Sequence, residues 1–329
     1  MRTVRTTLLT GAAALALALS GCGSSSDDAS EDGGSSGETR DVVDATGAEV
    51  TVPADPQRIV TLHYAATQPI LDLGLADQLV GQGVFEPGII PEDLADTVED
   101  IPVVAENVEP KLEEIAALEP DLILVPNVLE EEVTDQLAAV APVYTFTLRG
   151  GDRANWGQRT EEVADATNTS DRVDELEAEF EERQQSIAEE YADVIEGKTV
   201  AVLGAYEENN FYAWGESNMM GTLLMPLGFT WSEQENAIVE GQPEPEATVS
   251  NEKLTSAVGD ADLLFLDSNL RAEPNAFMTA LQETALYQDL PAVQAGHAWF
   301  AGKNTVAGYT DAHYTLDRVE EALQALAEE

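Results

Sequence analysis

Residues 168–197 read NTSDRVDELEAEFEERQQSIAEEYADVIEG, with neither glycine nor proline between Asp171 and Ile195. The apolar side chains of this stretch recur at helical spacing and share one face: Val173, Leu176, Phe180, Ile187, Tyr191 and Val194. Residues 168–170 can cap the first turn, acidic residues crowd that end as the helix dipole favours, and Gly197 can end the helix. The pattern therefore predicts one helix roughly 38 Å long, and its irregular spacing does not sustain a coiled coil.

Short apolar runs alternate with helical patterns on both sides of this stretch. The predicted strands cover residues 59–62, 79–81, 122–125, 143–148, 199–203, 263–266 and 298–300. The predicted helices between and after them cover residues 65–75, 112–118, 130–140, 219–227, 276–286 and 315–327. Such alternation is typical of mostly parallel sheets. The predicted fold is α/β, with two lobes of mostly parallel sheet flanked by helices and joined by the one long α-helix.

The N-terminus has the order of features that marks an exported protein. Arg2 and Arg5 precede an apolar run from Leu8 to Leu19, which is too short to span a bilayer, and Ser20-Gly21-Cys22 follows. A cysteine at this place resembles the bacterial lipobox, which implies that Cys22 is lipidated and becomes the new N-terminus. Cys22 is the only cysteine, so the chain can form no internal disulfide.

Residues 23–39 contain no large apolar side chain, which predicts a flexible tether between the lipid and the folded part. The domain organisation that follows has five parts. They are a signal peptide (1–21), the lipidated cysteine with its tether (22–40), an N-terminal lobe (41–155), a helical connection (156–197) and a C-terminal lobe (198–329).

The charge balance excludes several kinds of partner. The chain has 15 Lys and Arg against 63 Asp and Glu, a formal net charge of −48. Nucleic acid is excluded because phosphate binding needs clustered basic residues. An acidic surface also repels anionic lipids, so only the lipid would hold the protein to a membrane.

The motifs of catalysis and of free-metal binding are missing from the sequence. Its three histidines, His63, His297 and His313, do not have the spacing of metal ligands. No nucleophile elbow and no phosphate-binding glycine loop occurs. We therefore expect a binding protein that is not an enzyme and needs no cofactor, and any iron would arrive already chelated.

Several sequence blocks, in this order along the chain, resemble one family, the substrate-binding proteins of bacterial iron-siderophore and cobalamin importers. The blocks are residues 56–62, 71–77, 109–124, 221–224, 227–229 and 290–297. The resemblance implies capture of a metal chelate between two lobes and delivery to the permease of an ABC importer. A ferric siderophore is the expected ligand, and cobalamin or haem is the alternative within the family. An exported lipoprotein enzyme or an adhesin on the same scaffold is the alternative from another class.

The resemblance also implies how the protein meets its permease. The family uses one glutamate in each lobe for docking, and the matching residues are Glu113 and Glu252. Charge pairs of this kind set the register and the rate of docking. With the lipid anchor, the expected state is a monomer on the outer face of the cell membrane, in a bacterium with one membrane.

Ligand-binding residues are expected after strand ends, where an open α/β sheet exposes its crevice. This rule nominates His63 as a neighbour of the site and the following as ligand-binding residues: Tyr64, Asn127, Arg149, Tyr206 and Trp214. Trp214-Gly215 matches a pair found in hydroxamate-siderophore binders of the family. Glu216 stands where some of those proteins have an arginine.

Basic residues are rare enough to bear on the charge of the ligand. Only Arg149, Arg153 and Arg271 are placed near predicted strand ends. A tris-catecholate iron complex is strongly anionic and would need several basic residues. The sequence therefore favours a neutral or cationic chelate, such as a ferric hydroxamate.

Overall fold

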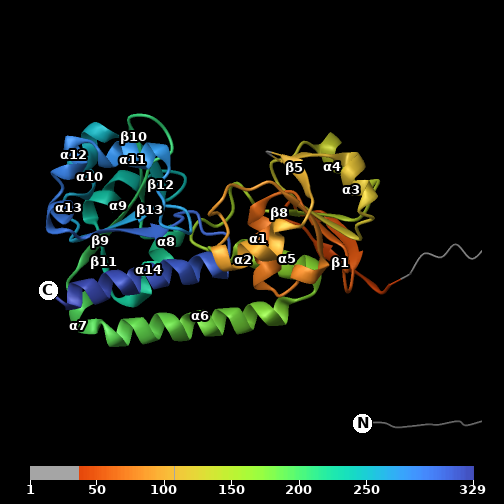
Figure 1. Ribbon diagram of the computed structural model, residues 1–329, viewed down its shortest axis with the longest axis horizontal. Helices are drawn as coiled ribbons and strands as arrows, with labels where there is room; N and C mark the ends of the chain where they lie inside the picture. The colour runs from red at the N-terminus through yellow and green to blue at the C-terminus, as the bar shows by residue number, and fades with distance from the viewer. Residues whose placement is uncertain (1–36, 107) are drawn as a thin grey trace, which may run out of the picture. The chain divides into compact units, whose positions relative to one another are not determined.

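The chain contains two six-stranded sheets, one formed by residues before the long helix and one by residues after it (Figure 1). The computed structural model describes residues 37–106 and 108–329, and residues 37–329 form one unit. Cys22, the predicted signal peptide and most of the predicted tether lie outside the described residues. The predicted α/β fold with two lobes is confirmed.

The sheet of the N-terminal lobe has the strand order β6-β5-β4-β3-β7-β8. Its strands are β3 (Ile59–Thr61), β4 (Leu79–Gly83), β5 (Val103–Glu106), β6 (Glu109–Pro110), β7 (Leu122–Pro126) and β8 (Val143–Phe146). All neighbours are parallel except β5 and β6, which are antiparallel. Every residue of β7 is buried, because helices cover both faces of the sheet, and this explains its uninterrupted apolar sequence.

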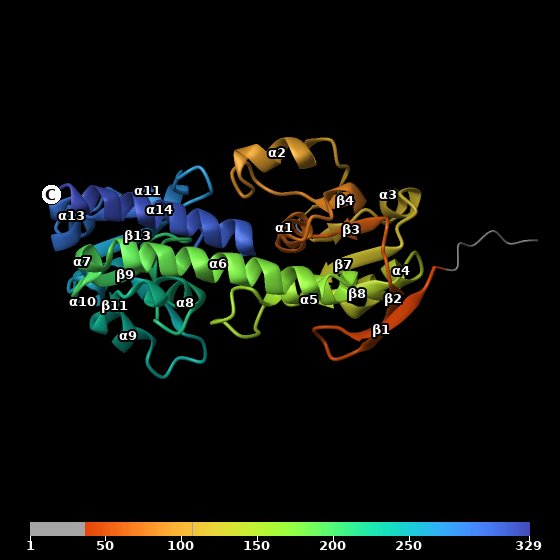
Figure 2. The same cartoon turned by 90° about the horizontal axis from the view of Figure 1, so that it is seen from below.

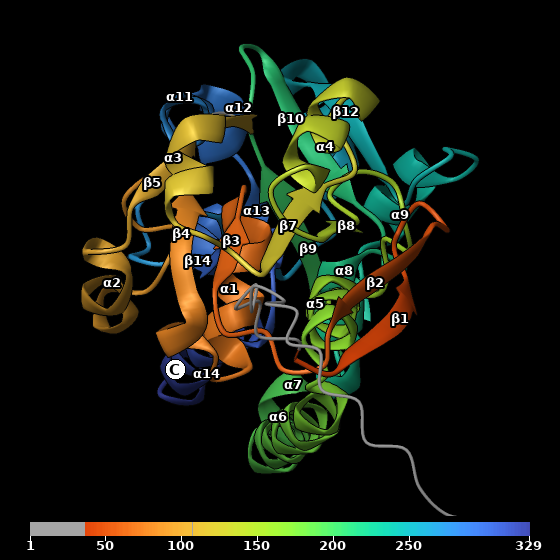
Figure 3. The same cartoon turned by 90° about the vertical axis from the view of Figure 1, so that its right-hand side faces the viewer.

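The side chains of successive residues in these strands point to opposite faces of the sheet and pack into two separate hydrophobic cores. Ile59 and Leu122 pack with α1 (Tyr64–Asp72) and α5 (Gln158–Thr167), whereas Val60 and Ile123 pack with α3 (Leu112–Ala117) and α4 (Glu131–Ala138). Figure 3 shows these two pairs of helices on opposite sides of the sheet. The lobe also contains α2 (Glu92–Glu99).

An antiparallel hairpin precedes this lobe and was not predicted. It consists of β1 (Thr39–Val43) and β2 (Glu49–Pro53). In each strand a single side chain is fully buried, Val42 in β1 and Val52 in β2, so the sequence carries little apolar alternation. Because β1 begins at Thr39, the last two residues of the predicted tether belong to a strand.

The sheet of the C-terminal lobe is mixed. Its path is β12-β10-β9-β13-β14, and β11 pairs with β9. The strands are β9 (Thr199–Gly204), β10 (Asn210–Trp214), β11 (Thr230–Trp231), β12 (Glu246–Ser250), β13 (Leu263–Asp267) and β14 (Ala298–Gly302). Strand β10 is antiparallel to both neighbours, β9 and β12, and neither β10 nor β12 was predicted. The helices are α8 (Met219–Leu224), α9 (Glu233–Val239), α10 (Leu254–Val258), α11 (Ala276–Gln282), α12 (Ala285–Gln288) and α13 (Pro291–Ala295).

The long helix is shorter than predicted. Helix α6 spans Ser170–Glu190, and the separate turn α7 (Ala192–Ile195) follows it. Tyr191 leaves the helical conformation, with φ −106° and ψ 18°, and its carbonyl accepts from the N–H groups of both Val194 and Ile195. Tyr191 and Ile195 are both buried, so the change of direction brings both side chains into the core. The apolar face predicted for the helix is buried, except for Val194, which is partly exposed.

Helix α14 (Tyr309–Ala327) runs beside α6, as Figures 1 and 2 show, and begins well before the predicted residue 315. Asp72, at the end of α1, accepts hydrogen bonds from the N–H groups of Tyr309 (2.8 Å) and Thr310 (3.3 Å) and from the Thr310 hydroxyl. This carboxyl group caps α14 from the other lobe. No local sequence signal could show that cap, and it explains the earlier start.

The Asp72 cap predicts a pH dependence of stability. Burial raises the pKa of Asp72 to about 7. Because this pKa lies above that of an unfolded aspartate, the stabilisation is complete below about pH 4 and is lost as the pH rises to about 7. We expect Asp72→Asn to remove a slope of up to about 1.4 kcal/mol per pH unit from the unfolding free energy across this window. Urea unfolding at several pH values measures it, and the exposed Asp77→Asn is the control. Parallel curves for Asp72→Asn and the parent would contradict the prediction.

None of the helices within residues 37–106 and 108–329 has the length and hydropathy needed to cross a bilayer.

Candidate functional site

A cavity of about 370 Å³ lies between the two lobes. Its walls come from the strand ends of both sheets and from the connection between the lobes. The lining residues are His63, Tyr64, Leu148, Arg149, Arg153, Arg159, Tyr206, Tyr212, Trp214, Glu246 and Thr305. Four of the five predicted ligand-binding residues, Tyr64, Arg149, Tyr206 and Trp214, are thus brought together.

On the N-terminal side, the end of β3 leads directly into the first turn of α1. His63 caps this helix, because its Nδ1 accepts the N–H of Ala65 at 3.1 Å, and its ring lies 4.5 Å from that of Tyr64. Burial, together with the positive charges of Arg159, Arg149 and Lys303, lowers the pKa of His63 to about 4. His63 is therefore neutral at pH 7, as an Nδ1 acceptor must be.

Asn127 follows β7 as predicted, but it does not line the cavity. Its amide donates to the carbonyl of Arg149 at 2.9 Å, and its oxygen accepts the N–H groups of Leu148 and Arg149 at 3.0 Å. Asn127 therefore positions the loop that carries Arg149.

Three arginines and one carboxylate line the cavity. Arg153 pairs with Glu246 of β12 at 2.6 Å, which links the interlobe connection to the C-terminal sheet. Arg159, in the first turn of α5, donates to the carbonyls of Thr147, Leu148 and Val306. Arg159 was not predicted from the sequence, because its side chain reaches the site from a helix. Arg271, which lies near a predicted strand end, does not line the cavity.

The C-terminal wall is aromatic. Tyr212 and Trp214 alternate along β10, and the ring of Tyr206 packs edge-on against Tyr212 at 4.9 Å. The Tyr206 hydroxyl donates to Asp267 at 2.9 Å, and burial together with the Asp267 charge raises the pKa of Tyr206. Tyr206 therefore keeps its proton and its hydrogen bond to Asp267 at neutral pH.

Trp214 is held firmly by its backbone, whereas its indole N–H is free. Its backbone N–H donates to buried Glu235 at 2.9 Å, and its carbonyl accepts from the indole of Trp231 at 2.9 Å. Only 2% of Trp214 is exposed, and its Nε1 has no hydrogen-bond partner among the described residues. An unpartnered buried donor in a residue that lines a cavity needs an explanation, and a bound ligand would provide one.

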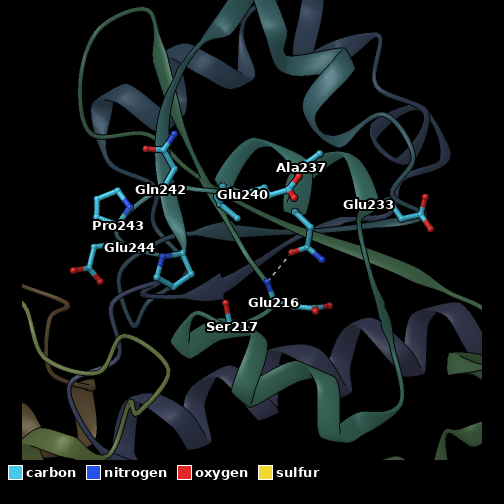
Figure 4. A pocket seen from close by; sticks show the side chains of 11 residues that line it. Glu216, Ser217, Glu233, Ala237, Glu240, Gln242, Pro243 and Glu244 are labelled. Atoms are coloured by element: carbon cyan, nitrogen blue, oxygen red, sulfur yellow. Dashed lines mark hydrogen bonds between the residues drawn. The ribbon is translucent and has the colours of Figure 1, made fainter.

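A second hollow, of about 610 Å³, lies entirely on the C-terminal lobe (Figure 4). Its lining includes Glu216, Glu233, Glu240 and Glu244 and no basic residue. The backbone N–H of Glu216 donates to Asn236 at 2.9 Å, so Glu216 lines this hollow and not the interlobe cavity. Across the described part of the chain, no three His, Cys, Asp or Glu side chains are grouped so that they could hold a metal ion.

The two glutamates expected to dock on a permease are exposed, one in each lobe. Glu113 is in the first turn of α3, and Glu252 is in the short 3-10 turn Asn251–Lys253 before α10. The structure thus leaves both side chains accessible to a partner.

Comparison with known proteins gives consistent matches. A family model described as periplasmic binding protein matches residues 59–305. The probable siderophore-binding lipoprotein YfiY of Bacillus subtilis is 30% identical over 312 residues, which cover 92% of this chain and 93% of that protein. The Fe(3+)-citrate-binding protein YfmC of the same organism is 26% identical over 318 residues, covering 93% and 92%.

A solved structure, the siderophore periplasmic binding protein from the fuscachelin gene cluster of Thermobifida fusca, superposes with a TM-score of 0.68 at 27% identity. The match covers 83% of this chain and 98% of that one. The likeness therefore extends over both lobes and the helix between them.

Proposed function

This chain belongs to the periplasmic binding protein family, and from that premise we propose that it binds a ferric siderophore between its lobes and delivers it to an ABC importer. The observation that carries the proposal is the interlobe cavity, where aromatic and basic side chains from both lobes converge. Relatives similar over more than nine-tenths of this chain bind siderophores or ferric citrate according to their names, which supports the same ligand class here.

Cobalamin and haem have weaker support. The two Bacillus subtilis relatives, each matched over more than nine-tenths of this chain, are described as binding iron complexes. His63 is the one histidine lining the cavity, and its Nδ1 already caps α1, so haem ligation would have to use the other ring nitrogen. The family is a class of binding proteins, and we propose no enzymatic activity for this member.

Tryptophan fluorescence tests the proposed function. Titration of the purified protein with iron-loaded siderophores, cobalamin and haem is expected to give saturable quenching by a siderophore with a dissociation constant below about 1 µM. Trp214 lies in the cavity wall and supplies the signal. Saturable binding of cobalamin or haem, without binding of any siderophore, would contradict the proposal.

We also propose that the protein is lipid-anchored through Cys22 on the outer face of the cell membrane. The order of charged, apolar and small residues before Cys22 supports export and lipidation. The similarity to a siderophore-binding lipoprotein supports the same placement. A tether between the lipid and β1 would keep the loaded cavity near the permease, and the protein would act as a monomer.

If Glu113 and Glu252 dock on the permease, their substitution should reduce iron uptake without changing siderophore binding. We expect the double variant Glu113→Gln, Glu252→Gln to bind the siderophore as the parent does while cellular uptake of labelled iron falls at least about tenfold, because truncating the charges of an interface weakens and slows docking. Glu114→Gln, next to Glu113 on α3 and also exposed, is the matched control. Unchanged uptake by the double variant would refute the docking role.

A further inference from the structure

The interlobe cavity concentrates positive charge within a strongly acidic protein. The chain has a formal net charge of −48, yet three arginines and a single carboxylate line this cavity. Building on the proposed function, we propose that the ligand is a ferric chelate of net negative charge, whose carboxylate or catecholate oxygens bind these arginines. This proposal differs from the neutral or cationic chelate that the sequence favours.

Two of the three arginines that line the cavity have no carboxylate partner among the described residues. The guanidinium of Arg149 forms no hydrogen bond or ion pair with any residue that the structure describes. Arg159 is bound to three backbone carbonyls and to no carboxylate within ion-pair distance. Arg159 is partly buried, and a partly buried positive charge without a counter-ion is unfavourable until an anion fills the site. Arg149 is exposed, so its guanidinium is solvated and has no partner to give up before it binds an anion.

The walls of the cavity also offer hydrogen-bond donors that have no acceptor. Among the described residues, Arg153 Nε and Trp214 Nε1 are buried donors without an acceptor, and both residues line the cavity. A ligand whose acceptor oxygens reach these two atoms would satisfy them. Carboxylate and catecholate oxygens are such acceptors, and the planar guanidinium fork matches a carboxylate in a bidentate arrangement.

Salt screening limits how far the acidic residues outside the cavity control which ligand it accepts. The acidic residues elsewhere on the protein would repel an anion, but at physiological salt charges separated by more than about 8 Å are largely screened. The acidic hollow at Glu216–Pro245 lies on one lobe only and shares no lining residue with the cavity. The groups that line the cavity therefore decide which chelate it accepts.

Four iron complexes separate the possibilities by charge and by oxygen type. Purified full-length protein is titrated at about 0.15 M salt, by tryptophan quenching, with ferric citrate, ferric enterobactin (a tris-catecholate), ferrichrome (a neutral hydroxamate) and ferrioxamine B (a cationic hydroxamate). We expect at least one of the two anionic complexes to bind at least about tenfold more tightly than both hydroxamates. The anionic complex that binds more tightly shows whether the arginines recognise carboxylate or catecholate oxygens.

Variants of the cavity-lining residues test whether positive charge in the cavity raises the affinity for anionic complexes. Arg149→Gln is expected to weaken the favoured anionic complex about 10- to 100-fold and to leave ferrichrome within about threefold, because a hydrogen bond to a charged group is lost. Glu246→Gln removes the single acid and is expected to strengthen the same complex several-fold. Arg271→Gln makes the same charge change as Arg149→Gln at a residue outside the cavity and should alter neither affinity.

The outcomes distinguish this inference from the proposed function. Tightest binding of a hydroxamate would overturn the inference and leave siderophore binding intact, as would an Arg149→Gln variant that weakens all complexes equally. A Glu246→Gln variant that weakens the anionic complex while remaining folded would also overturn it. Binding of cobalamin or haem alone would overturn the proposed function itself.

Discussion

Asp311→Ala is expected to destabilise the protein by about 3–5 kcal/mol, because it leaves a buried ammonium group without its carboxylate. Lys303 Nζ lies 2.6 Å from Asp311 Oδ2, and the two side chains are only 6% and 1% exposed. Lys303 also donates to the carbonyl of Ile89 at 3.1 Å and lies 5.0 Å from the ring centre of Tyr64, both in the N-terminal lobe. The substitution therefore loosens the junction of the two lobes next to the cavity.

Urea unfolding measures this effect. Replacing both partners, by Lys303→Met with Asp311→Leu, is expected to destabilise less than Asp311→Ala alone, since no buried charge is left unpaired. Asp317→Ala removes a partly exposed partner of Arg183 and should change stability by less than about 1 kcal/mol. A loss below about 1 kcal/mol for Asp311→Ala itself would show that Lys303 finds water or another acceptor.

Glu235→Ala is the second substitution with a large expected effect, about 3–5 kcal/mol of stability. Glu235 is fully buried and accepts the backbone N–H groups of Trp214 at 2.9 Å and Val202 at 3.2 Å. Alanine would leave both donors unsatisfied and open a void between β9 and β10. Because Trp214 lines the cavity, we also expect weaker siderophore binding.

Glu235→Gln is the matched control. Burial raises the pKa of Glu235 well above its ordinary value, which favours the neutral carboxylic acid, and an amide resembles that form in shape. Glutamine keeps one acceptor oxygen, and we expect a loss of about 1–2 kcal/mol, clearly less than for alanine. Equal losses for the two variants, measured by urea unfolding, would show that the charge of Glu235 rather than its shape and acceptors stabilises the sheet.

The sequence predicted those parts of the fold whose signal is local and repeated. The apolar face of α6 and the uninterrupted apolar strands β7, β9 and β13 are examples. Strands β10 and β12 were missed, because their side chains alternate irregularly between buried and partly exposed positions. The break at Tyr191 and the early start of α14 depend on tertiary contacts that no local pattern reveals.

The candidate site residues were predicted from their positions after strand ends more than from the chemistry of their side chains. Tyr64, Arg149, Tyr206 and Trp214 meet because they follow or end strands at facing edges of two sheets. Arg159 was missed, since nothing in the sequence of α5 shows which way its first turn faces. The charge of the ligand stays a prediction, since the scarcity of basic residues favours a neutral or cationic chelate whereas three arginines line the cavity. The residue roles themselves remain predictions.

The central claim is that the cavity between the lobes receives an iron chelate. The most direct measurement is a crystal structure of the protein with a bound ferric siderophore, with the iron located by its anomalous scattering. The account predicts one strong iron peak in the cavity bounded by Tyr64 and Arg149 on one side and by Tyr206 and Trp214 on the other. An iron peak at the acidic hollow of Glu216 and Glu240, with the interlobe cavity empty, would contradict it.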